Sequence, residues 1–241
     1  MDERAASPVI VPSARFWSWW VGGSLFLSAL ASAFVIDGLM YDVHTRQVEA
    51  SGGPVAAELA ISHHRLIDLS HVFVPILGLT GLFWLLWQYR AHADLVTMRV
   101  PGLQFRPIWG VGSWFAPLAN AFLPCLAVGE LWKASDPEAA DADWRSRRVT
   151  PLVWLWWLGW CATVALGVLG LISMWGSTTS NVRLMDRDRY FVAACGVLIV
   201  TALAAAWLIK LLNDRAFVKA NRAGGPMWPS WRRATSRRPQ G

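Results

Sequence analysis

Long runs of apolar residues, separated by polar segments, dominate the hydrophobic pattern of this chain. Four of these runs contain no Lys or Arg: 16–40, 71–89, 152–175 and 190–209. A bilayer core of about 30 Å needs about 20 helical residues, because each residue adds about 1.5 Å. Each run is therefore long enough to cross a membrane as one helix. The pattern predicts an all-α fold class, a polytopic integral membrane bundle with four transmembrane helices.

A fifth apolar run, 108–132, contains Pro117, Asn120, Pro124 and Glu130, which a straight helix exposed to lipid tolerates poorly. The two prolines predict a pair of short half-helices of about 10 residues each, which reach about half the bilayer depth. The broken run either re-enters, leaving the membrane on the side where it entered, or spans it as a fifth helix.

The distribution of positive charge bears on this choice, because Lys and Arg accumulate in cytoplasmic loops. Re-entry places 17 of the 22 Lys and Arg residues on one side of the membrane and five on the other. A fifth span divides them 14 to 8. The sharper division favours re-entry, with both termini in the cytoplasm.

Three regions follow from the same pattern. Residues 1–15 are expected to be a disordered cytoplasmic lead, residues 16–212 the transmembrane helical domain, and residues 213–241 a disordered basic cytoplasmic tail. The tail carries seven Lys or Arg residues and one acid, with Trp228 and Trp231 among them. A basic segment beside a membrane favours contact with the bilayer and its anionic lipids, and we expect no nucleic-acid partner.

The composition agrees with a membrane protein, and the sequence lacks the common motifs of catalytic and cofactor sites. The chain is 55% hydrophobic and 16% charged, with 17 Trp and a mean hydropathy of +0.36, which excludes an ordinary soluble domain. The three cysteines lack C-x-x-C spacing. No P-loop, G-x-S-x-G elbow or G-x-G-x-x-G fingerprint occurs, so we predict no catalytic residues and no cofactor.

His64, Asp68 and His71 are the weak candidates for metal ligands. Their spacing of four and three residues places them on one face of a helix, where imidazole and carboxylate ligands converge. No HExxH pairing supports a metal site. A pH-sensitive polar patch, or simple solvation of the helix, is the favoured interpretation.

Residues 84–132 carry a set of motifs. The second apolar run ends in Trp-Gln-Tyr-Arg-Ala at 87–91, similar to a W-x-Y-R-A ending. Residues 112–120 read Gly-Ser-Trp-Phe-Ala-Pro-Leu-Ala-Asn, similar to a G-x-W-F-x-P-x-x-N block. The candidates for structural or binding roles in these motifs and just after them are Arg90, Trp114, Phe115, Pro117, Asn120, Pro124, Glu130 and Trp132.

These motifs resemble those of the bacterial membrane proteins grouped as domain of unknown function 4328. The resemblance extends over residues 70–212, and one departure is Asp94, which stands where the family usually has Asn. The resemblance implies a polytopic fold in a bacterial plasma membrane. It supplies no established activity.

Several functions stay open at this stage. We favour a non-enzymatic scaffold, or a component that binds lipid, a membrane protein partner or further copies of itself. A small transporter or channel using the break around Pro117 and Asn120 is the alternative, because broken helices hold substrate sites in transporters. A metal-binding enzyme or sensor is the third. Arg90 and Glu130, at the ends of their apolar runs, either form a salt bridge or each extend separately to water, and the sequence favours neither arrangement.

Overall fold

The computed structural model describes residues 12–139, 143–173 and 180–222, which form α-helices and two short 3₁₀ turns and contain no strand. The elements in chain order are α1 (Ala14–Ala50), α2 (Ala56–Thr97), α3 (Pro107–Gly112), η1 (Ala119–Ala121), α4 (Leu123–Ala134), η2 (Trp144–Ser146), α5 (Pro151–Ile172) and α6 (Asn181–Arg222). The all-α fold class is confirmed.

Four of the described helices are long and apolar enough to cross a membrane: α1, α2, α5 and α6. They correspond to the four predicted apolar runs. Three of them extend well beyond these runs, and α6 continues through residues 213–222 of the expected tail as a helix. Residues 223–241 and 1–11 lie outside the described residues.

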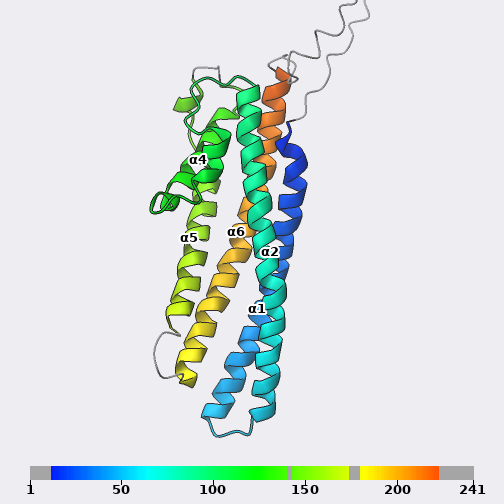
Figure 1. The fold of residues 1–241 in the computed structure, drawn as a ribbon, viewed down its shortest axis with the longest axis vertical. Helices are drawn as coiled ribbons and strands as arrows, with labels where there is room; N and C mark the ends of the chain where they lie inside the picture. The colour runs from blue at the N-terminus through cyan, green and yellow to red at the C-terminus, as the bar shows by residue number, and fades with distance from the viewer. Residues whose placement is uncertain (1–11, 140–142, 174–179, 223–241) are drawn as a thin grey trace, which may run out of the picture. The chain divides into compact units, whose positions relative to one another are not determined.

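The helices divide between two compact units, described separately below. Unit 1 contains residues 1–18, 87–149 and 210–241, and unit 2 contains residues 19–86 and 150–209. In unit 2, residues 19–50 of α1 run beside residues 56–86 of α2, and α5 runs beside residues 181–209 of α6 (Figure 1).

Small side chains allow α1 and α2 to approach closely in unit 2. Ser24, Ser28 and Ser32 repeat every four residues on α1, and all three are buried. The Ser28 and Thr80 hydroxyls are hydrogen bonded at 2.8 Å, and Thr80 also donates to the Ser24 carbonyl at 3.1 Å. Small residues with hydroxyl groups are a common way for membrane helices to associate.

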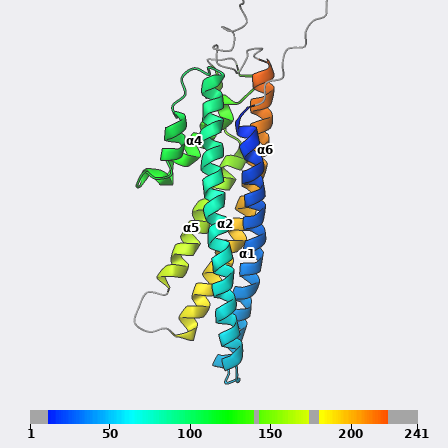
Figure 2. The same ribbon diagram turned by 45° about the vertical axis from the view of Figure 1, so that its right-hand side comes forward.

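In unit 1 the fifth apolar run is broken into separate helices, as its prolines predicted. The first helix, α3, has only six residues, and η1 and α4 follow after a non-helical stretch that contains Pro117. Pro124 lies in the first turn of α4, where its missing N–H costs no hydrogen bond. The chain between α2 and α5 therefore folds back on itself as a hairpin (Figure 2).

Replacing Ser28 tests the packing of α1 on α2. Ser28→Leu should lower the free energy of unfolding by about 1–3 kcal/mol, because the larger side chain overpacks the contact. Ser28→Ala should cost only about 0.6 kcal/mol, the value of one hydrogen bond between membrane helices. Thermal unfolding of the purified chain in detergent measures both changes. Phe26→Leu is the control, since Phe26 is 66% exposed; equal effects of Ser28→Leu and Ser28→Ala would contradict this packing.

Candidate functional site

Glu130 closes the hairpin of unit 1. Its side chain receives the backbone N–H of Gln104 at 2.7 Å and that of Phe105 at 3.0 Å, one on each carboxylate oxygen. Burial raises the pKa of Glu130, and the two N–H groups and the nearby Arg145 only partly offset this. The start and the end of the hairpin are thus held together by one buried carboxyl group.

Of the two arrangements considered for Arg90 and Glu130, the salt bridge does not form. Both oxygens of Glu130 are taken by backbone donors, and Arg90 is exposed. The charge of Arg90 instead acts on Asp94, one turn further along α2. The partners of Glu130 are backbone N–H groups of the hairpin and not the side chain of an arginine. A sequence does not show where backbone groups lie in space.

Gln88 joins α2 to the hairpin through two hydrogen bonds. This fully buried side chain donates to the Gly110 carbonyl at 3.0 Å and accepts from the Trp114 indole N–H at 2.9 Å. Gly110 packs so closely on His92 that a Cβ there would lie 2.9 Å from the imidazole ring. The motif residue Trp114 therefore has a structural role, fixing the break in the hairpin against α2.

Asp94 joins α2 to the start of α1. Its carboxylate accepts the N–H groups of Ser13 at 3.0 Å and Ala14 at 2.8 Å, and also the Ser13 hydroxyl at 2.7 Å. These N–H groups lie at the start of α1, where helix amides lack partners and favour negative charge. An Asn has one acceptor oxygen in place of two, so it would not make all three bonds.

The bend of the hairpin is apolar and exposed. Phe115, Leu118 and Phe122 are 71%, 92% and 70% exposed. Pro117 and Asn120 are exposed there too, and among the described residues no hydrogen bond joins the Asn120 side chain to another group. The structure thus gathers exposed apolar side chains around Asn120.

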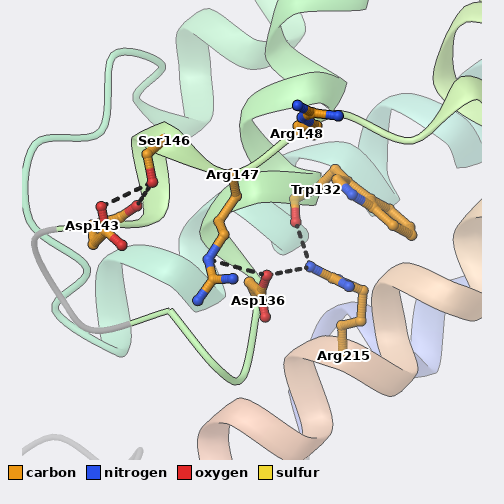
Figure 3. Close-up of a pocket in the computed structure, with 7 residues that line it drawn as sticks. All are labelled: Trp132, Asp136, Asp143, Ser146, Arg147, Arg148 and Arg215. Atoms are coloured by element: carbon orange, nitrogen blue, oxygen red, sulfur yellow. Dashed lines mark hydrogen bonds and ion pairs between the residues drawn. The ribbon is translucent and has the colours of Figure 1, made fainter.

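A cluster of charged side chains lies at the other end of the hairpin. Trp132, Asp136, Asp143, Ser146, Arg147, Arg148 and Arg215 line a cavity of about 510 Å³, which we call the arginine cradle (Figure 3). The guanidinium groups of Arg147 and Arg215 lie on either side of Asp136, at 3.7 Å and 3.2 Å from its Oδ2 atom.

Basic side chains of α6 position the cradle against the end of α4. Arg215 donates to the Trp132 carbonyl at 3.3 Å, and Lys219 donates to the Ala134 carbonyl at 2.8 Å. The last carbonyls of a helix have no partner within the helix, and cations near them are stabilised. Arg215 also lies over the Trp132 ring, with its guanidinium carbon 4.3 Å from the ring centroid.

Asp136 organises the two arginines but does not satisfy them. Burial alone would raise the pKa of Asp136, but the Glu138 N–H and the charges of Arg215 and Arg147 outweigh it and lower that pKa. Its charge therefore stabilises the fold above the usual pKa of an aspartate, and this contribution is lost as pH falls through the lowered value. The Nε atoms of both arginines are buried and have no hydrogen-bond partner.

The metal candidates do not converge. His64, Asp68 and His71 are all exposed on α2, and His64 and Asp68 border an apolar cavity formed with α1. Within the ranges that the structure describes, no group of three or more His, Cys, Asp or Glu side chains is arranged to hold a metal ion.

Replacing Glu130 tests the closure of the hairpin. Glu130→Gln should lower the free energy of unfolding by about 1.5–3 kcal/mol, because the amide nitrogen cannot accept and one backbone N–H loses its charged partner. Thermal unfolding in detergent measures the loss. Glu138→Gln is the matched control, since Glu138 is exposed. If the two variants were equally stable, Glu130 would not hold the hairpin closed.

Comparison with known proteins agrees with the motifs found in the hairpin. A family model described as Domain of unknown function (DUF4328) matches residues 49–214, which include the whole hairpin and Glu130. No curated protein and no solved structure matches the chain. The family match covers more than half of the sequence. The chain therefore belongs to the DUF4328 family of proteins with a domain of unknown function.

Proposed function

We propose that this protein is a non-enzymatic binding component of the bacterial plasma membrane, and that its arginine cradle holds the phosphate group of an anionic lipid. The observation that carries the proposal is the cavity lined by Arg147, Arg148 and Arg215. Within the residues that the structure describes, the buried Nε atoms of Arg147 and Arg215 have no hydrogen-bond partner, and that of Arg147 makes only the 3.7 Å ion pair with Asp136. Guanidinium groups bind phosphate through several N–H donors at once. Arg148 adds a third positive charge to the cavity.

The charge balance of the cradle favours an anion. Three arginines face Asp136 and Asp143, which leaves a net charge of +1 in the cavity lining. Asp136 holds the guanidinium groups of Arg147 and Arg215 in place before any ligand arrives. A preformed site loses less conformational entropy on binding than a set of free surface arginines would lose.

The surroundings of the cradle favour a lipid over a soluble phosphate. Arg215 follows the last residue of the apolar run, Ile209, by six positions, which places it about 9 Å further along the helix axis. Trp132 stacks on Arg215, and Trp is enriched at the level of lipid headgroups. Both features match the depth at which lipid phosphates lie.

The hairpin supports the same orientation. Its exposed apolar bend is suited to insertion into hydrocarbon, and its two ends meet at Glu130. Re-entry from the cytoplasmic side puts the cradle and both termini at the inner leaflet, where anionic lipids attract basic residues. The tail, of which residues 223–241 lie outside the described residues, then supplies further positive charge to the same lipids.

The test compares two exposed arginines of unit 1, one in the cradle and one outside it. Arg148→Gln should weaken binding of phosphatidylglycerol by about fivefold, because each cation at an anionic surface contributes about 1 kcal/mol. Arg106→Gln, which does not line the cradle, should leave the affinity unchanged. Native mass spectrometry of the full chain in neutral detergent measures both affinities, with phosphatidylcholine as the reference lipid.

Two further measurements distinguish lipid binding at the cradle from binding of soluble phosphate and from lipid binding by the tail. If inorganic phosphate displaced the lipid completely, the cradle would be a site for soluble phosphate and the lipid assignment would be wrong. Changing Arg232, Arg233, Arg237 and Arg238 of the tail to Gln should lower affinity without changing the ratio between the Arg148 and Arg106 variants. Equal affinities of those two variants would contradict the proposal.

A further inference from the structure

Two aspartates from distant parts of the sequence meet inside unit 2. Asp42 on α1 and Asp188 on α6 are each fully buried. One guanidinium nitrogen, Nη2 of Arg187, lies 2.5 Å from Oδ1 of Asp188 and 3.9 Å from Oδ2 of Asp42. The two carboxyl groups thus share one guanidinium nitrogen and lie next to each other.

The charged and polar groups that face this pair come from all three of the helices it joins. On α1, Arg46 donates from Nε to Oδ2 of Asp42 at 2.6 Å. On α2, the hydroxyl of Ser62 donates to the other oxygen of Asp42. On α6, Arg187 donates from Nε to Oδ1 of Asp188 at 2.6 Å. Asp42 thus receives donors on both oxygens.

Asp188 is left with one unsatisfied oxygen. Both contacts from Arg187 fall on Oδ1, while Oδ2 is buried and receives no hydrogen bond from any N–H or O–H group of the described residues. A buried carboxylate oxygen without a donor is costly. Its missing partner is supplied if a hydrogen atom lies between the two carboxyl groups.

Two adjacent carboxyl groups can be hydrogen bonded to each other only through such a hydrogen. Ionised carboxylates are acceptors only, so a hydrogen bond between them forms only when one of them is protonated. Two negative charges in contact at a buried position also repel, which favours a single shared proton. Arg46 and Arg187 are close enough to balance both charges once the proton has left.

We propose that Asp42 and Asp188 form a proton-binding site, in which the two carboxyl groups share one exchangeable proton. Uptake of the proton adds one positive charge to a cluster that is otherwise neutral, and its release leaves two carboxylates held by Arg46 and Arg187. The site lies where α1, α2 and α6 come together, so its protonation state acts on the contact between these helices. It is independent of the arginine cradle.

Infrared spectroscopy of the full chain in lipid nanodiscs detects a protonated carboxyl group by its C=O stretching band. An isolated aspartate has lost its proton well below neutral pH. We expect this pair to give an acid band that persists above that range, shifts in deuterated water and disappears as pH rises further. Asp188→Asn and Asp42→Asn should each abolish the band.

Control variants assign the band to this pair. Asp37→Asn should retain it, because Asp37 is an exposed acid of α1 paired with Arg65. Glu130→Gln should retain it too, which excludes the buried carboxyl group of the hairpin. Asp42→Asn also leaves one acceptor oxygen in place of the two that receive Arg46 and Ser62, which can impair folding. The Asp188 variant and the titration of the unmodified chain therefore decide the outcome. An absent band in the unmodified chain, or a band that survives Asp188→Asn or is lost with Glu130→Gln, would overturn the proposal.

Discussion

The hydrogen bonds from the Gln104 and Phe105 N–H groups to Glu130 are the interaction on which the organisation of unit 1 depends. A chain that leaves the helical conformation near a bilayer must satisfy its backbone polar groups within the protein, since lipid provides no donors or acceptors. One carboxylate does this for two amides at once. It also sets the separation between the end of α2 and the end of α4, so the chain that follows α4 starts from a fixed point.

The closed hairpin also helps to position the arginine cradle. The Trp144 indole donates to the Pro101 carbonyl at 2.9 Å, and Arg145 donates to the carbonyl of Gly102, so the segment after α4 is fastened to the start of the hairpin. That segment presents Arg147 and Arg148, and α6 presents Arg215. In unit 2 the buried carboxyl groups of Asp42 and Asp188 are compensated by Arg46 and Arg187. The two clusters carry the two proposals made above, an anion site in unit 1 and a shared proton in unit 2.

The fold was largely predictable from sequence, because apolar runs of membrane length and two prolines are local signals. The four helices and the broken fifth run follow from these signals. The sites were not predictable in the same way. Arg147 and Arg215 are separated by 68 positions and Asp42 and Asp188 by 146, and no spacing rule relates such residues. The sequence could not decide whether Arg90 pairs with Glu130 for the same reason, since the partners of Glu130 are backbone amides without a sequence signature.

The most direct test of this account is the sidedness of the two ends of the hairpin. Single cysteines at Thr97 and Glu138, in a chain whose Cys125, Cys161 and Cys195 are replaced by Ala, can be labelled with a thiol reagent that does not cross membranes. Closure by Glu130 with re-entry predicts that both positions are protected in intact cells and both react after lysis. Labelling of one position in intact cells would show that the segment crosses the membrane, and would contradict the hairpin and the placement of the cradle at the inner leaflet.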